Sequence, residues 1–249
     1  MSPAEVTALS AAAALLLTMP VYALAARNRT RDADVARRPR TAILGYWVRD
    51  WLMWVIAPLE RVLVKGRVPP AALNWLGVVF GLAAGIAYAR GAFALGGWLV
   101  LLGGSADVLD GRIARAGGLV SNAGAFLDST LDRFAETFAY AGLAVGFAPS
   151  AGRVLASVMA MGGSLLVSYA RARGEGLGVH FKGGLMQRAE RLVLLALASL
   201  LDPVMSGEAG WPAGRLLAAV LALIAVASVG TALYRTVRIA RMLEEGLPR

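Results

Sequence analysis

Long apolar runs recur along this chain, and they restrict its fold more than any other feature. They extend over about Thr7–Ala26, Ala71–Ala89, Phe93–Val108, Ala135–Phe147, Val154–Val167, Leu192–Leu201 and Leu216–Leu233. A helix needs roughly 17 to 25 residues to cross about 30 Å of hydrocarbon, and the shorter runs reach this length when flanking residues are included. With 58% hydrophobic and 16% charged residues, the chain lacks the polar surface of a soluble domain. We expect an all-α integral membrane protein with about seven spans.

The basic residues lie mainly in alternate loops between these runs. Ten of the 25 Lys and Arg residues lie between the first two runs: Arg27, Arg29, Arg31, Arg37, Arg38, Arg40, Arg49, Arg61, Lys65 and Arg67. The loops of the opposite parity contain only Arg90, Arg153 and Arg215. This positive-inside pattern predicts a multi-pass protein of the cell (inner) membrane with its N-terminus outside and its C-terminus in the cytosol. It also accounts for the net charge of +9 without a nucleic-acid partner.

Four segments are expected from these patterns. Residues 1–27 form an N-terminal transmembrane anchor, which we interpret as uncleaved because its leading segment carries Glu5 and no Lys or Arg. Residues 28–68 form a cytosolic linker and, in "YWVRDWLMWVIAPLERVLVKGR", an amphipathic helix. Its tryptophans alternate with charges, which favours the headgroup layer over a tilted extra span. Residues 69–240 form the membrane domain and residues 241–249 a cytosolic tail.

Four aspartates interrupt the apolar pattern within "SADVLDGRIARAGGLVSNAGAFLDSTLDR", residues 105–133. At about 100° per residue, Asp107 and Asp110 fall on one helical stripe, and Asp128 and Asp132 on another. The segment "RAGGLVSN" joins the two helices into an antiparallel hairpin, so the four carboxylates should converge at one depth. Each would cost at least about 2.5 kcal/mol unpaired in the bilayer, so cations must neutralise them.

The chemistry of the donors specifies which cations these are. The chain has no Cys and a single His, so hard carboxylate oxygens predict Mg²⁺ or Mn²⁺, and four carboxylates suit two ions. Metal pairs of this kind stabilise the oxygens of an in-line phosphoryl displacement. A charge network that packs helices, or the ion pathway of a transporter, is the alternative interpretation. An intramembrane prenyltransferase is another, although its two acidic motifs would lie far apart in sequence.

The aspartates belong to a longer pattern, D-x2-D-G-x2-A-R-x8-G-x3-D-x3-D, which resembles without gap or substitution the signature of the CDP-alcohol phosphotransferases. The resemblance covers about residues 60–240 and implies a six-helix bundle, to which this chain adds the anchor and the interfacial helix. It implies that the four aspartates bind two metal ions and that Asp132 is also the catalytic base. Residues implied to contact the CDP moiety are Gly111, Ala114, Arg115 and Gly124, together with Asn74 from a motif that also includes Pro70 and Gly77.

The resemblance implies a reaction in which an acceptor hydroxyl attacks CDP-diacylglycerol and CMP leaves, in phospholipid biosynthesis. "GAFLDSTLDR", "SYARARGEGLG" and "QRAERL" are similar to the branch that makes phosphatidylinositol phosphate. That branch implies inositol phosphate as acceptor, with Arg171, Arg173, Arg188 and Arg191 as candidate contacts. Glycerol phosphate, serine or a second lipid remain alternative acceptors. The resemblance also implies a homodimer in the lipid bilayer.

Overall fold

A computed structural model describes residues 3–26, 32, 35, 45–148 and 150–246. Most of the basic linker and the last residues of the tail lie outside these ranges. The described part contains no strand and eight helices: α1 (Pro3–Ala25), α3 (Tyr46–Lys65), α4 (Pro70–Ala89), α5 (Phe93–Ala116), α6 (Asn122–Gly146), α7 (Ala151–Glu175), α8 (Arg188–Glu208) and α9 (Arg215–Glu244). The prediction of an all-α fold is confirmed, with α4–α9 as its six-helix bundle. The four segment boundaries remain predictions.

Five of the described helices are long and apolar enough to cross a membrane, namely α1 from Val6 onwards, α4, α5, α7 and α9. This supports a multi-pass membrane protein. Two further expected spans correspond to α6 and α8, whose charged side chains set them apart from the other helices by composition. Several of these charges, among them Asp132, Glu136, Arg188 and Arg191, form ion pairs inside the bundle, as described below. Helices α5 and α6 also extend well beyond their apolar runs, and these extensions carry Asp110, Asp128 and Asp132, with Asp107 at the end of the run of α5.

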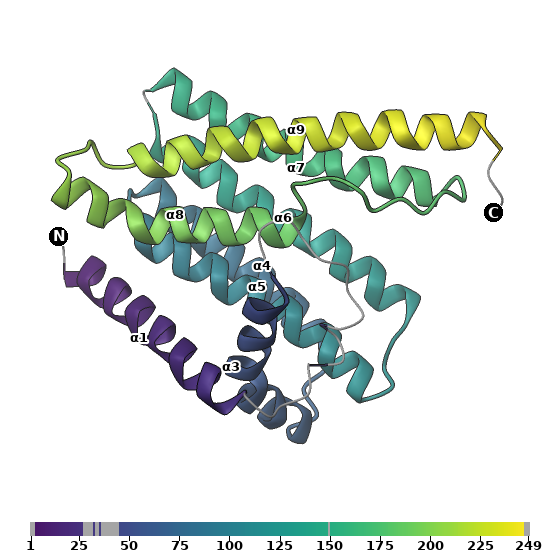
Figure 1. Cartoon of the computed structure of the whole chain (residues 1–249), viewed down its shortest axis with the longest axis horizontal. Coiled ribbons are helices and arrows are strands. Elements are labelled where there is room, and N and C mark those ends of the chain that lie inside the picture. Colours follow the sequence, from purple (N-terminus) through teal and green to yellow (C-terminus); the bar gives the residue numbers. More distant parts are fainter. Residues whose placement is uncertain (1–2, 27–31, 33–34, 36–44, 149, 247–249) are drawn as a thin grey trace.

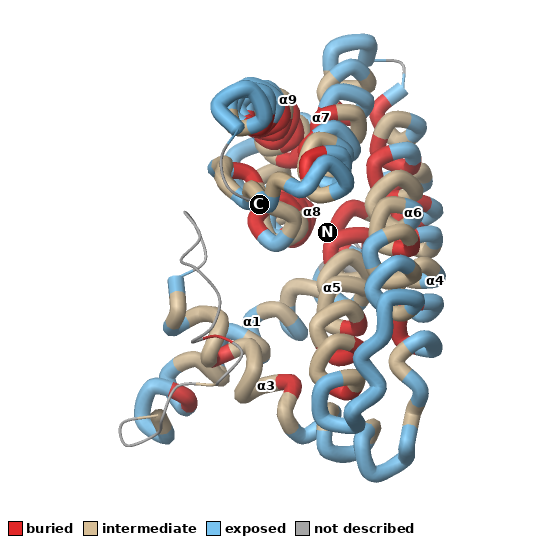
Figure 2. The backbone as a smooth tube through the Cα atoms, turned by 90° about the vertical axis from the view of Figure 1, so that its right-hand side faces the viewer, coloured by how far each residue is buried: buried red, intermediate tan, exposed pale blue. Residues whose placement is uncertain are grey.

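The bundle consists of two groups of three helices (Figures 1 and 2). In the first, α4 packs closely against both α5 and α6, which touch each other little. In the second, α7 packs against α9, and α8 connects the two groups by lying against both α5 and α9. The gap left between α5 and α6 is therefore bounded by α4 and α8. The aspartates occupy this position.

Small residues allow α4 and α6 to approach closely. A Cβ atom at Gly85 of α4 would overlap the backbone carbonyl of Phe138, and one at Gly142 of α6 would overlap the backbone of Gly85. Helices in membranes associate through such contacts because apolar side chains gain little by leaving lipid. The close contact fixes the position of α6 on α4.

A buried carboxylate connects α8 to the start of α9. Asp202 is 1% exposed, and its oxygens accept hydrogen bonds from the backbone N–H groups of Gly214 at 2.6 Å and Leu217 at 3.1 Å. These donors lie at the beginning of α9, where the first N–H groups have no partner within the helix. Asp202 thus acts as a cap supplied from another helix, which explains one charge inside α8.

Helices α1 and α3 lie together on one side of the bundle, next to α5 (Figure 2). Figure 1 shows that α3 runs across the direction of α7, α8 and α9. This orientation agrees with the predicted interfacial helix. The large apolar side chains of α1, among them Leu16, Leu17 and Leu24, are exposed, as expected for a helix that faces lipid.

Candidate active site

The aspartates lie on a helical hairpin whose turn is defined by local sequence. Helix α5 ends at Ala116, and Gly118 adopts a φ of +64°, a left-handed conformation that favours glycine. Ser121 then caps α6, because its hydroxyl accepts a hydrogen bond from the N–H of Gly124 at 3.1 Å. The predicted hairpin is therefore present, with Asp107 and Asp110 before the turn and Asp128 and Asp132 after it.

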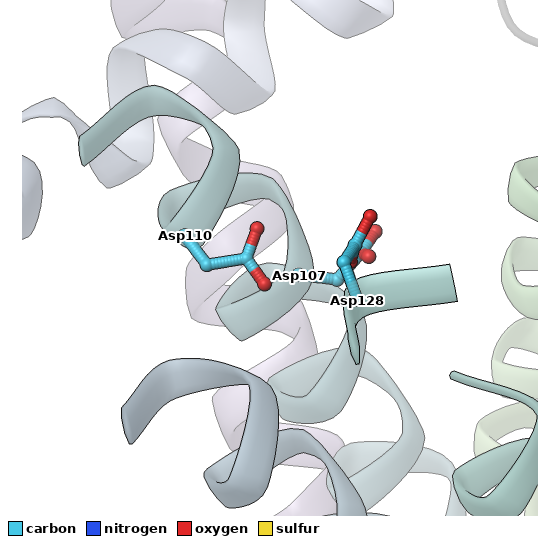
Figure 3. A group of neighbouring side chains, drawn as sticks. All are labelled: Asp107, Asp110 and Asp128. Atoms are coloured by element: carbon cyan, nitrogen blue, oxygen red, sulfur yellow. The ribbon is translucent and has the colours of Figure 1, made fainter. Parts of the chain in front are cut away.

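Three carboxylates form an acidic cluster, which consists of Asp107, Asp110 and Asp128. One oxygen from each lies within 4.8 Å of the others. Figure 3 shows the side chain of Asp128 beside that of Asp107, with Asp110 pointing towards both. Asp110 is only 4% exposed. Two helices thus direct three negative groups into one small volume.

The fourth aspartate contacts a cation instead. Asp132 forms an ion pair with Arg188, in which Oδ1 lies 2.7 Å from Nη2. Nη1 of the same guanidinium lies 2.8 Å from Oδ2 of Asp107. Arg133 is a more distant neighbour of Asp132, at 4.0 Å. Arg188 begins α8 and bridges α5 to α6, so it neutralises part of the charge that the sequence places there.

The remaining carboxylate oxygens fit a divalent metal. Oδ2 of Asp110 and Oδ1 of Asp128 are buried and have no hydrogen-bond partner among the described residues. A buried carboxylate oxygen without a donor is unfavourable unless a cation neutralises it. Carboxylate oxygens at this spacing are the ligands that Mg²⁺ and Mn²⁺ prefer. The acidic cluster can therefore hold a metal ion.

A pocket opens beside the acidic cluster, bounded by α4, α5, α6 and α8. Its polar lining includes Asn74, Asp107, Asp110, Asp132 and Arg188. Asn74 is 9% exposed and lies on the first turn of α4. Most of the remaining lining is apolar or glycine, including Gly77, Gly81, Gly103 and Gly104. The structure thus places the predicted nucleotide contact of α4 in the same pocket as three of the aspartates.

The other predicted CDP contacts lie on the outer turns of the hairpin. Gly111 and Ala114 are half-buried, and Arg115 is exposed. The guanidinium of Arg115 lies over Gly111, where an added Cβ would come within 3.1 Å of it. Gly124 is half-buried on the first turn of α6. These residues lie towards the turn that joins the end of α5 to the start of α6.

The four candidate acceptor arginines have different surroundings. Arg188 lies in the site, and its Nε has no hydrogen-bond partner among the described residues. Arg191 is 1% exposed and pairs with Glu136 through bonds of 3.0 and 3.3 Å. Arg171 pairs with Glu175 one turn away on α7 at 2.8 Å. Arg173 lines a separate apolar groove between α7 and α9. Of these four described arginines, Arg188 is the one that contacts the aspartates of the hairpin.

Sequence reasoning missed Glu136. This residue lines the pocket and holds Arg191 in the protein interior. A usable signal was present, because Asp128, Asp132 and Glu136 follow one another at intervals of four and share a face of α6. The pair supports α8 one turn after Arg188.

Comparisons with known proteins show the family of this chain. The family model for CDP-alcohol phosphatidyltransferase matches residues 67–229. A phosphatidylinositol phosphate synthase from Streptomyces avermitilis is 35% identical over 182 residues, covering 71% of this chain and 72% of the relative. An archaetidylinositol phosphate synthase from Methanothermobacter thermautotrophicus is 35% identical over 142 residues, covering 57% of this chain and 71% of the relative.

Solved structures of the Mycobacterium tuberculosis phosphatidylinositol phosphate synthase are also similar, at 28% identity. The structure with CDP-DAG bound has a TM-score of 0.65 and covers 73% of this chain and 92% of its own. The structure with manganese and citrate has the same TM-score and covers 73% and 87%. Fold and site together define a helical membrane enzyme that transfers a phosphate-linked group. The chain belongs to the CDP-alcohol phosphatidyltransferase family.

Proposed function

We propose that this enzyme transfers the phosphatidyl group of CDP-diacylglycerol to a hydroxyl of inositol phosphate and releases CMP. The observation that carries the proposal is the acidic cluster with its two unpartnered carboxylate oxygens, which opens into a pocket shared with Asn74. The names of the relatives support the substrates, since the tuberculosis enzyme was solved with CDP-DAG and both sequence relatives form inositol phosphate lipids.

The proposed reaction is a single displacement at phosphorus. The acceptor oxygen forms a bond to the phosphorus that carries the diacylglycerol, and the bond from that phosphorus to the bridging oxygen of CMP breaks. Asp132 takes the proton of the acceptor hydroxyl, as the family resemblance implies. The carboxylate lies at the edge of the acidic cluster and faces the pocket, a suitable place for a base that must reach an incoming hydroxyl.

We assign the metal ligands to Asp107, Asp110, Asp128 and Asp132, with two Mg²⁺ or Mn²⁺ ions. The manganese in the tuberculosis structure and the hard oxygen donors here support this assignment. When bound, such ions neutralise charge on the diphosphate of the donor. The helices contribute the orientation, because each supplies two carboxylates from consecutive turns of one face.

Arg188 is the residue that we propose binds the phosphate of the acceptor. Its guanidinium already lies between Asp107 and Asp132, and its Nε has no partner among the described residues. A guanidinium can present several donors to a phosphate at once. Arg191 acts indirectly in this proposal, since its own donors are occupied by Glu136 and the Met186 carbonyl.

The position in the membrane follows from the charge pattern. We propose that the site faces the cytosol from the inner membrane, with the N-terminus outside, because the loops near the site are the basic ones. The family resemblance supports a homodimer. Reactivity of single engineered cysteines with a membrane-impermeant reagent tests the orientation without background, since the chain has no Cys.

Radiolabelled CDP-diacylglycerol tests the proposed reaction. Purified enzyme with Mg²⁺ or Mn²⁺ is offered inositol phosphate, inositol, glycerol phosphate or serine, and CMP and lipid products are measured. We expect product with inositol phosphate, no CMP release by Asp132→Asn, and normal turnover by Lys182→Gln, a loop cation outside the pocket. Product with another acceptor alone would overturn the acceptor assignment, and normal turnover by Asp132→Asn would overturn the site.

A further inference from the structure

The N-terminal helices α1 and α3 precede the segment that matches the family, which begins at residue 67. They nevertheless contact α5, the helix that carries Asp107 and Asp110. Neither helix contributes a residue to the pocket beside the acidic cluster. Helix α1 also lies against α8, whereas α3 lies against α5, so an effect of α3 on the chemistry passes through α5.

Helix α3 contacts the end of α5 through an apolar cluster and an ion pair. Ile56 packs with Leu109 and Ile113, all less than 10% exposed. Beside them, Nε of Arg112 lies 2.7 Å from the Glu60 carboxylate. Nη1 of Arg112 also lies 3.1 Å from each oxygen of Asp32. One guanidinium therefore ties α5 to two preceding segments.

The ion pairs of Arg112 affect the orientation of α5, and therefore of the aspartates that it carries. Arg112 follows Asp110 by two residues, or about 200° around the helix, so it projects from the opposite side. Asp110 points towards Asp128 while Arg112 is held by Glu60. A forked guanidinium held by two carboxylates has a defined geometry, and it adds this directional restraint to the apolar contacts between α3 and α5. The rotation of α5 decides where Asp107 and Asp110 point.

Helix α1 in turn holds α3 and the start of α5. The indole N–H of Trp51 donates to the Thr18 hydroxyl at 2.9 Å. Tyr22 packs against Trp47 and Trp54, with ring centroids 5.6 and 5.7 Å apart.

The first turns of α1 are fixed as well, because the indole N–H of Trp98 on α5 donates to the carbonyl of Ala8 at 2.8 Å. Helix α1 therefore contacts the first turns of α5 directly. It is connected to the last turns of α5 through α3. In an apolar environment such polar contacts have no water to replace them.

We propose that α1 and α3 form a brace that fixes the rotation of α5, with Glu60 and Arg112 as positioning residues for the metal-binding aspartates. The inference rests on the proposed metal site. It assigns to the N-terminal helices a role in the reaction, in addition to anchoring the chain in the membrane.

Mn²⁺ binding to the full-length protein in nanodiscs tests the brace, with free Mn²⁺ measured by electron paramagnetic resonance. Arg112→Gln should weaken binding about tenfold, at the lower end of the effect of losing support around metal ligands. Glu60→Gln should weaken it less, because Asp32 still holds Arg112. The double variant should match Arg112→Gln, since Arg112→Gln already removes the interaction that Glu60→Gln removes. Arg61→Gln changes a neighbouring guanidinium whose hydrogen bond among the described residues goes to the Ala57 carbonyl, and it should bind as wild type.

The contribution of α1 is tested by a matched pair on that helix. Tyr22→Ala removes the ring that packs between the two tryptophans and should weaken Mn²⁺ binding severalfold. Leu17→Ala changes a side chain that is 69% exposed and should leave binding unchanged. Amide hydrogen exchange over residues 105–116 gives a readout that needs no metal. It should be faster in Arg112→Gln and Tyr22→Ala, faster to a smaller extent in Glu60→Gln, and unchanged in Leu17→Ala and Arg61→Gln.

Wild-type Mn²⁺ affinity and exchange in Glu60→Gln and Arg112→Gln would overturn the brace. If Arg112→Gln does not fold, Arg112→Lys takes its place, because lysine keeps the positive charge and lacks the forked donors of the guanidinium. Wild-type Mn²⁺ affinity and exchange in Arg112→Lys would also overturn the brace. A wild-type protein that binds no Mn²⁺ would instead refute the metal site, and hydrogen exchange would still decide whether the brace exists.

Discussion

Replacement of Arg188 by alanine gives a direct measure of how the site balances its charges. The guanidinium holds Asp107 at 2.8 Å and Asp132 at 2.7 Å, and its side chain is 26% exposed. Each charge-assisted hydrogen bond contributes about 1.5–3 kcal/mol, and removal of one partner of a buried pair costs about 3–5 kcal/mol. Because the site is partly open to solvent, we expect a loss near the lower limit, about 3 kcal/mol, in metal-free protein.

The loss should depend on metal, because a divalent ion in the acidic cluster replaces the missing positive charge. About 3 kcal/mol corresponds to a decrease in Tm of roughly 6–12 °C for a chain of this size. We expect this decrease in EDTA and less than about half of it at saturating Mg²⁺ or Mn²⁺. Thermal unfolding in detergent, followed by tryptophan fluorescence with and without metal, provides the measurement.

Arg171→Ala is the matched control for this experiment. Its ion pair with Glu175 lies one turn apart on the surface of α7, with side chains 43% and 32% exposed. Such pairs contribute less than about 1 kcal/mol, and this one lies away from the acidic cluster. The Tm of Arg171→Ala should change little and independently of metal. An equal decrease for Arg188→Ala with and without metal would refute the reasoning.

Three further changes separate stability from chemistry. Asp202→Ala removes the cap of α9 and should lower stability by about 2–4 kcal/mol, measured as Tm, with CMP release unchanged at a temperature where the variant is folded. Glu136→Gln should lower stability by about 3–5 kcal/mol because it leaves Arg191 unpaired, and Glu136→Gln with Arg191→Met should recover part of the loss; no recovery in this double variant would argue against the pair. Gly85→Ala should destabilise by about 1–3 kcal/mol through overlap with α6, whereas Gly162→Ala, which has open space around it, should be neutral or stabilising; equal effects would contradict the close packing.

The sequence predicted the parts of the fold that depend on local patterns. Apolar runs located the helices, and the spacing of Asp107, Asp110, Asp128 and Asp132 located the hairpin, because both follow from helical periodicity. The residues at which α5 ends and α6 begins were harder to predict from the sequence. Their polar ends continue as helix because the aspartates face one another inside the protein, which hydropathy alone does not reveal.

The pairing of charges could not be predicted from local patterns. Arg188 lies 56 residues after Asp132 in the sequence, and only the packing of α8 against α5 brings its guanidinium to the aspartates. The same holds for Arg191 and Glu136, and for Arg112 and Glu60. The sequence predicted that these arginines lie near the cytosolic face but could not distinguish Arg188 in the site from Arg173 in a separate groove.

The central claim is that a divalent metal binds between Asp107, Asp110 and Asp128. Anomalous diffraction from crystals of the full-length protein grown with Mn²⁺ measures this directly. We expect an anomalous peak in contact with carboxylate oxygens of all three aspartates, and loss of that peak in Asp128→Asn. A well-ordered site without a peak, or a peak held by other residues, would contradict it.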